Sequence, residues 1–234
     1  MLGLELELDS SFEAVVTRME EKRMRSAVAV TVGNRYSGWN QVDCHLSAQQ
    51  LNAALGEHGL RMELWIDQQG GAPMLDRLRR LLASQVRPTD DGFVFCFCGH
   101  GGATELSGND KVPTSYQDIV NAIDAEPRLK RKPKLVVFDC CQGKTAAGLK
   151  LPENMIVARS TALGESAWCE AEKAKGAFYS NRLATAIRSY ATTNSVEDLL
   201  KLTQGEVHEL KTPKPQIAHV VSALGAYHLY LGGV

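Results

Sequence analysis

The chain has 234 residues, of which 44% are hydrophobic and 23% charged, and its net charge is −1. These values fit one ordinary globular domain with a full core; they give no reason to expect a nucleic acid or a membrane as a partner. Residues 1–9 are acidic and lack the basic lead and apolar core of a signal peptide, so we expect the six cysteines to be reduced and the protein to be cytoplasmic.

The hydrophobic pattern alternates between short apolar runs, typical of strands, and apolar stripes at helical spacing. Such alternation predicts an α/β fold with a mostly parallel sheet and helices on both faces. A helix is expected over 10–25, and it either packs on the domain or recruits a partner. The other expected helices cover 42–56, 74–85, 115–125, 176–190 and 195–210. The expected strands cover 26–32, 61–66, 93–98, 134–138 and 155–158, and a β-rich segment over 216–231 closes the chain.

Two of these strands lead directly to a reactive residue. Residues 93–98 lead to His100, and residues 134–138 lead to Cys141. With a helix between them, the two strands form a strand–helix–strand unit and should run parallel. The carboxyl ends of neighbouring parallel strands meet at one edge of an open sheet, where sites form. We therefore expect His100 and Cys141 to lie close together.

A cysteine beside a histidine suits nucleophilic catalysis. The thiolate is the reactive form, and histidine is the usual base near neutral pH. Gly101 and Gly102 would let backbone amides approach a substrate carbonyl, and the amide of Cys141 could join them as an oxyanion site. Taken alone, each reactive residue is more often structural, the cysteine as a small core side chain.

A metal site is a second interpretation of the same residues. Cys96, Cys98 and His100 share one face of a strand, and Cys140 and Cys141 follow the next catalytic strand. The spacing signatures of zinc sites are absent, however. We therefore favour nucleophilic catalysis over a metal role.

The two motifs resemble those of the caspase and metacaspase clan of cysteine peptidases. Gly99, His100 and Gly101 look like its histidine motif, and residues 139–143 look like its nucleophile pentapeptide. The nucleophile is the third residue of that pentapeptide. By this register Cys141 is the nucleophile and Cys140 is its neighbour.

The resemblance covers most of the chain, including residues 26–34, 132–135, 160–164 with Trp168, and 216–231. It implies a caspase-like fold, with a central six-stranded, mostly parallel sheet and helices on both faces. It also implies cysteine endopeptidase activity on protein or peptide substrates. The expected parts of this one structural domain are a lead segment over 1–25, a large-subunit-like part over 26–142, a processing linker over 143–154 and a small-subunit-like part over 155–234.

The resemblance further implies cleavage after Arg or Lys. Caspases hold an aspartate with two arginines, and by this register Ser37 and Cys169 stand in their places. Metacaspases use acidic residues instead, and Asp43 and Asp139 match them; Cys98 matches a small polar residue near the histidine. Two carboxylates suit a guanidinium or an ammonium group.

The resemblance also bears on cofactors and partners of the protein. Many metacaspases need calcium, but the acids between His100 and Cys141 form no recognisable cluster, so no calcium site is assigned and the sequence requires no cofactor. An apolar edge strand over 220–231 would favour a weak homodimer. The alternatives are a catalytically silent homologue that acts as a regulatory binding partner, or an α/β protein whose cysteines are redox-active or structural.

Overall fold

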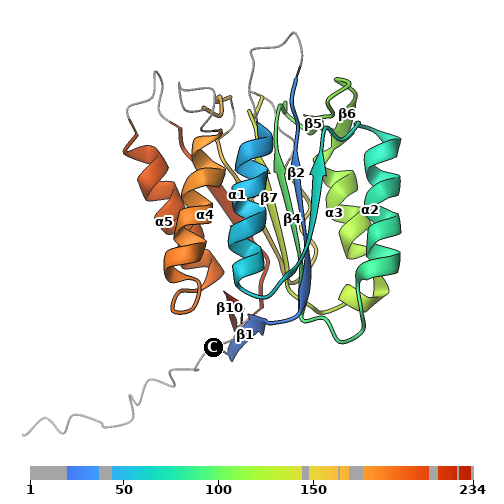
Figure 1. The fold of residues 1–234 in the computed structure, drawn as a ribbon, viewed down its shortest axis with the longest axis vertical. Helices are drawn as coiled ribbons and strands as arrows, with labels where there is room; N and C mark the ends of the chain where they lie inside the picture. The colour runs from blue at the N-terminus through green and yellow to red at the C-terminus, as the bar shows by residue number, and fades with distance from the viewer. Residues whose placement is uncertain are drawn as a thin grey trace, which may run out of the picture.

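The computed structural model describes residues 20–36, 44–143, 148–162, 164–168, 176–210, 216–225 and 227–232. A sheet flanked by helices lies at its centre (Figure 1). This sheet has six strands in the order β3-β2-β4-β7-β8-β9. All neighbours pair in parallel except β8 and β9, which are antiparallel. The expected mostly parallel α/β sheet is therefore confirmed. Its strands are β2 (Ala27–Gly33), β3 (Arg61–Ile66), β4 (Gly92–Cys98), β7 (Lys134–Asp139), β8 (Met155–Arg159) and β9 (His219–Ser222).

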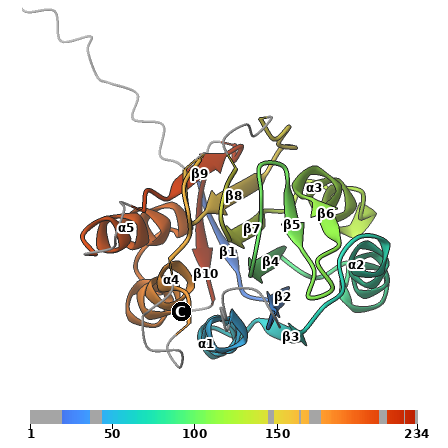
Figure 2. The same cartoon turned by 90° about the horizontal axis from the view of Figure 1, so that it is seen from above.

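Helices cover both faces of this sheet (Figure 2). One face packs against α1 (Cys44–Glu57), α4 (Phe178–Tyr190) and α5 (Val196–His208), and the other against α2 (Ala72–Gln85) and α3 (Tyr116–Asp124). Because successive strand residues point to opposite faces, each face has its own core. Along β4, for example, Val94 and Cys96 belong to the α1 side, whereas Phe93 and Phe95 belong to the α2 side.

Local chemistry explains where the helices begin. Ser115 Oγ accepts a hydrogen bond from the Asp118 amide at 3.4 Å, and Pro73 lies in the first turn of α2. Helix α4 has no such cap, because Ala177 stands at its N-cap position. A first-turn amide of α4, that of Ser180, instead donates to the carboxylate of Asp139 at 2.9 Å. The start of α4 is thus tied to the end of β7.

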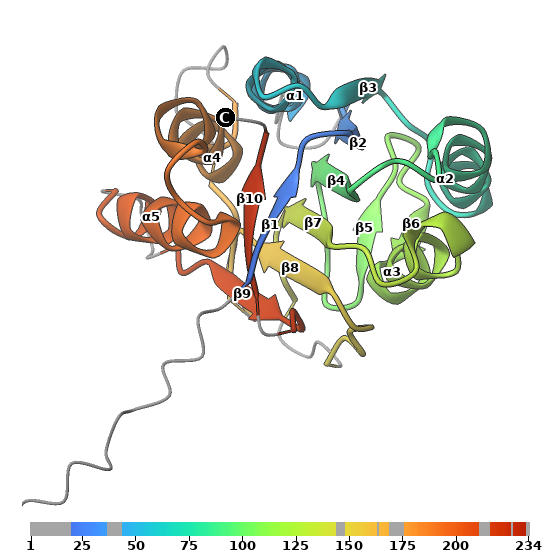
Figure 3. The same cartoon turned by 90° about the horizontal axis from the view of Figure 1, so that it is seen from below.

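The two ends of the chain differ from the expectation. Residues 20–24 are not the end of a helix but the strand β1 (Glu20–Met24), which pairs in parallel with β10 (Tyr227–Leu231) (Figure 3). The rest of the expected helix lies outside the described residues. The expected single edge strand over 220–231 is also wrong, because only its first part, β9, lies at an edge of the main sheet, whereas β10 pairs with β1 in a separate two-stranded sheet. Tyr227, Leu229 and Leu231 of β10 are buried in the same core as α4 and α5.

A short hairpin that the sequence did not suggest separates β4 from α3. It consists of β5 (Glu105–Ser107) and β6 (Pro113–Ser115), which pair antiparallel; a single 3₁₀ turn, η1 (Pro127–Leu129), lies between α3 and β7. The amide of Ser107 donates to the carbonyl of His100 at 2.9 Å. The hairpin therefore fixes the chain directly after β4. No helix among the described residues is long and apolar enough to cross a membrane.

Candidate active site

The carboxyl ends of β4 and β7 lie side by side, as the sequence predicts. Their register pairs Cys98 with Asp139, and the amide of Gly99 donates to the carbonyl of Asp139 at 3.1 Å. His100 and Cys141 each follow two residues after this last pair, so both lie at the same edge of the sheet. Both of these side chains are partly exposed. A thiol and an imidazole are thus carried by neighbouring strand ends at an edge that a substrate can reach.

The two adjacent cysteines have different surroundings. Cys140 is fully buried in the core that faces α2 and α3, whereas Cys141 is partly exposed. Burial raises the pKa of the Cys140 thiol to about 12. A buried thiol that keeps its proton is a poor nucleophile. Cys141 is the thiol that a substrate can meet.

His100 is supported by Tyr36, a residue that sequence reasoning missed. The Tyr36 hydroxyl accepts a hydrogen bond from the His100 amide at 3.0 Å and donates to the carbonyl of Ser107 at 2.8 Å. The two ring centroids are 4.3 Å apart. Burial lowers the pKa of His100 below its ordinary value. The imidazole is therefore neutral near pH 7 and can accept a proton.

The two glycines after His100 have different roles. A Cβ on Gly101 would lie 2.6 Å from Cys140 Sγ and 2.7 Å from Tyr116 Oη, so only glycine fits there. The Gly102 amide, which we expected to approach a substrate, donates to the carbonyl of Glu105 at 2.8 Å. That part of the expectation is wrong, because the turn into the β5–β6 hairpin uses this amide.

Asp139 is buried, and its two carboxylate oxygens differ. Oδ2 accepts from the amide of Ser180 at 2.9 Å and from its hydroxyl at 2.6 Å. Oδ1 is buried and has no hydrogen-bond partner among the described residues. Burial raises the pKa of this carboxyl, although the bonds from Ser180 and the nearby side chain of Ser160 act in the opposite direction. Ser160 Oγ is within reach of the carboxylate, but no hydrogen bond to Oδ1 is formed. An unpaired buried oxygen is costly, and a ligand that carries a donor would relieve that cost.

Cys98 and the start of α1 lie next to Asp139. Cys98 Sγ is 3.0 Å from Ser180 Oγ, so Ser180 contacts both predicted pocket residues. Cys98 also packs against Cys44 and Ala48 of α1. The structure thus brings Cys98 and Asp139 together, and it adds Ser180, which no pattern in the sequence marked.

Asp43, the second acid of the predicted pocket, lies outside the described part of the chain, as do Ser37 and Cys169, which stand where caspases have two arginines. The role of Asp43 stays a prediction. The residue that follows Asp43 is Cys44, whose packing against Cys98 is described above.

The loop after β8 closes the other side of the nucleophile strand. Thr161 Oγ1 donates to the carbonyl of Cys140 at 3.4 Å. The side chain of Gln216 joins this loop by accepting from the Trp168 amide at 2.9 Å and donating to the carbonyl of Ser160 at 2.9 Å. Segments far apart in the sequence therefore meet at one edge of the sheet.

Comparison with known proteins agrees with this arrangement. A family model described as the caspase domain matches residues 26–225, which include both motifs. The chain belongs to the caspase-domain family. Membership in this family indicates a cysteine peptidase. No curated protein is significantly similar to the chain.

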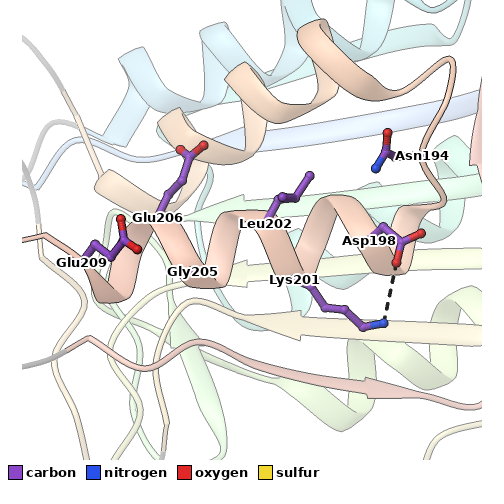
Figure 4. A pocket seen from close by; sticks show the side chains of 7 residues that line it. All are labelled: Asn194, Asp198, Lys201, Leu202, Gly205, Glu206 and Glu209. Atoms are coloured by element: carbon purple, nitrogen blue, oxygen red, sulfur yellow. Dashed lines mark ion pairs between the residues drawn. The ribbon is translucent and has the colours of Figure 1, made fainter.

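Within the described ranges of this caspase domain, no group of three or more His, Cys, Asp or Glu side chains is placed so that it could hold a metal ion. A hollow of about 520 Å³ runs along α5 (Figure 4). It carries both signs of charge, with Lys201 Nζ 3.6 Å from an Asp198 oxygen. It contains no nucleophile, and its lining residues are Asn194, Asp198, Lys201, Leu202, Gly205, Glu206 and Glu209.

Proposed function

We propose that this caspase-domain protein is a cysteine endopeptidase that cuts peptide bonds after Arg or Lys. The main support for this proposal is the set of groups at one edge of the sheet. At the edge of the sheet where the strand ends that carry His100 and Cys141 lie side by side, Asp139 has a buried carboxylate oxygen without a partner among the described residues. The first pair suits attack on a carbonyl, and the unpaired oxygen suits a cationic side chain.

The reaction proceeds through a thioester. His100 removes the proton from the Cys141 thiol, and Sγ forms a bond to the scissile carbonyl carbon. The negative charge that develops on the carbonyl oxygen is stabilised by the backbone amides of Gly101 and Cys141. His100 then gives the proton to the leaving amine as the C–N bond breaks. Water, deprotonated by His100, hydrolyses the thioester and restores the thiol.

The preference for a cation rests on the surroundings of Asp139. A guanidinium or ammonium group would donate to Oδ1 while Ser180 continues to hold Oδ2. A nearby cation favours the ionised carboxyl and so opposes the effect of burial on its pKa. A substrate aspartate would place two like charges together in a buried site, which is unfavourable. Asp43 is proposed as the second acid, and the packing of Cys44 against Cys98 supports this assignment.

The test uses fluorogenic peptides that differ only in the residue before the scissile bond. We expect the wild type to release the fluorophore after Arg and Lys and not after Asp, and we expect the Cys141→Ala variant to release none. Preferential cleavage after Asp would contradict the specificity. Equal rates in the wild type and the Cys141→Ala variant would contradict the activity.

We also propose that the enzyme works with reduced thiols in the cytoplasm and forms a weak homodimer. The described cysteines are all free, which supports the first part. Strand β9 lies at the edge of the sheet, and two apolar side chains near it are exposed, Val221 at 42% and Ile217 at 46%. Exposed edges of this kind tend to pair. Sedimentation at micromolar concentration that gives only the monomer mass of 25.6 kDa would contradict the dimer.

A further inference from the structure

The hydroxyl of Tyr116 lies where three segments of the site meet. It donates to the carbonyl of Gly102 at 3.3 Å, in the segment that carries the histidine. It is 3.1 Å from Cys140 Sγ, in the segment that carries the nucleophile. It also accepts from Gln142 Nε2 at 3.2 Å. Tyr116 itself begins α3 and is buried.

These contacts use the whole hydrogen-bonding capacity of a phenol, which has one donor and two acceptor positions. The O–H of Tyr116 serves Gly102, and its oxygen receives the S–H of Cys140 and an N–H of Gln142. Because burial raises the pKa of Cys140 to about 12, this thiol keeps the proton that it donates. The phenol is therefore fully used and has no position left for a substrate, whereas Gln142 Oε1 beside it has no partner among the described residues.

Gly101 packs directly against Cys140 and Tyr116. The space beyond its Cα is occupied by Cys140 Sγ and Tyr116 Oη, at 2.6 and 2.7 Å from where a Cβ would be. If either side chain moves, the support beneath Gly101 is lost. The amide of Gly101 is the proposed oxyanion donor, so its position decides how well the developing charge is stabilised.

The cluster also reaches the loop after β8 through Gln142. The backbone amide of Gln142 donates to the carbonyl of Glu165 at 3.1 Å. The backbone carbonyl of Gln142 accepts from the amide of Gly164 at 3.0 Å. Tyr116 therefore connects the histidine segment, the nucleophile segment and this loop through one buried oxygen.

We infer that Tyr116 is a positioning residue, which fixes the Gly101 amide relative to Cys141 through its bonds to Gly102 and Cys140. The inference rests on the proposed peptidase function. Tyr116 does not touch the reacting atoms. A misplacement of about 1 Å in a catalytic group can lower a rate about a hundredfold.

The test variant is Tyr116→Phe, which keeps the ring and removes only the hydroxyl. We expect kcat on an Arg peptide to fall about tenfold to a hundredfold, with KM within about twofold of the wild type. The matched control is Tyr227→Phe. Tyr227 is also buried, and its hydroxyl donates to Asn154 Oδ1 at 2.9 Å, a contact that involves no residue of the site. We expect kcat of this control to equal that of the wild type.

Two substitutions of Cys140 test whether a hydrogen-bond donor to the Tyr116 hydroxyl is needed. Cys140→Ser keeps a donor for the phenol and should stay near the wild-type kcat, whereas Cys140→Ala should lose activity severalfold. A purely structural role for the cluster would instead lower the melting temperature and leave kcat per folded molecule unchanged.

A kcat of Tyr116→Phe within twofold of the wild type, or a loss that only tracks the folded fraction, would overturn the inference. If the wild type cuts no peptide, the proposed function fails and the inference is decided by alkylation of Cys141 with iodoacetamide. A slower alkylation in Tyr116→Phe than in wild type would then support the positioning role. An equal rate would overturn it.

Discussion

The two sides of strand β7 hold their polar groups in opposite ways. Towards α2 and α3, Cys140 contacts a Tyr116 hydroxyl whose three hydrogen-bonding positions are all in use. The atom of this cluster that lacks a partner among the described residues is a neutral amide oxygen, Gln142 Oε1. Towards α4, the buried carboxyl of Asp139 uses one oxygen and leaves the other unpaired within the described structure. Paired polar groups make a rigid support, whereas an unpaired buried group is completed when a ligand arrives. The difference suggests a supporting side and a binding side within one strand end.

The largest expected effect separates the two cysteines themselves. Cys141→Ala should lower kcat/KM about a thousandfold or more, because the nucleophile is lost. Cys140→Ser should keep most of the activity, because Cys140 is buried and never meets the substrate. Steady-state kinetics on an Arg peptide measures both. If the Cys140→Ser variant is inactive and the Cys141→Ala variant is active, then Cys140 and not Cys141 is the nucleophile.

The next effect removes the charge on the binding side. Asp139→Asn keeps an oxygen that can accept from Ser180, but it loses the carboxylate. Breaking a buried ion pair costs about 3–5 kcal/mol, and for a substrate side chain that enters from water we expect roughly 2–4. The specificity constant for Arg peptides should therefore fall about 30- to 1000-fold.

Asp76 supplies the control for this substitution. It is an exposed carboxylate on α2, and Asp76→Asn should leave the specificity constant unchanged. If Asp139→Asn keeps the wild-type preference for Arg, the unpaired oxygen is not the specificity determinant, and the bond from Ser180 is the whole role of Asp139.

A smaller effect concerns self-cleavage in the predicted linker over 143–154, whose basic residues are Lys144 and Lys150. Lys144 lies outside the described residues. At Lys150 the side chain of Gln117 binds both backbone groups, with Oε1 accepting from the amide at 2.9 Å and Nε2 donating to the carbonyl at 3.1 Å. A backbone held in this way resists nicking. We expect intact-mass measurements to show a cut after Lys144 and none after Lys150.

Gln117→Ala should add a cut after Lys150, and Asn121→Ala should not. Asn121 accepts from the same Gln117 amide at 2.9 Å but does not touch the linker. The Cys141→Ala variant should stay uncut throughout. An active preparation with an uncut chain would show that processing is not needed.

The smallest effect is the pH dependence of stability. Because burial raises the pKa of Asp139, the folded protein binds this proton more tightly than the unfolded chain does. The stabilisation is present below the ordinary pKa of about 3.9 and is lost as the pH rises towards the folded value. Asp139→Asn should therefore gain melting temperature relative to wild type as the pH rises above the ordinary pKa of about 3.9. A difference that is constant, or that moves the other way, would show that Asp139 is ionised without a ligand.

The sequence predicted those parts of the fold that depend on local pattern. The strand ends that carry His100 and Cys141 were found because short apolar runs and glycines mark them. The pairing of β1 with β10 could not be found, because a strand that pairs at such distance in sequence leaves only a weak local pattern.

The supporting residues of the site were also invisible in the sequence. Tyr36, Tyr116 and Ser180 act through contacts with residues far along the chain, and each looks locally like an ordinary loop or helix residue. The Gly102 amide was assigned wrongly for the same reason, because the β5–β6 hairpin that uses it was not predicted.

The central claim is that Cys141 attacks and that the Asp139 side of β7 selects a cation. The most direct test treats the wild-type protein with two peptidyl ketone electrophiles that differ only in Arg or Asp next to the reactive carbon, followed by peptide mapping of all six cysteines. The account predicts modification of Cys141 alone, and far faster by the Arg probe than by the Asp probe. Faster reaction with the Asp probe, or modification of Cys140 or Cys98 in place of Cys141, would contradict it.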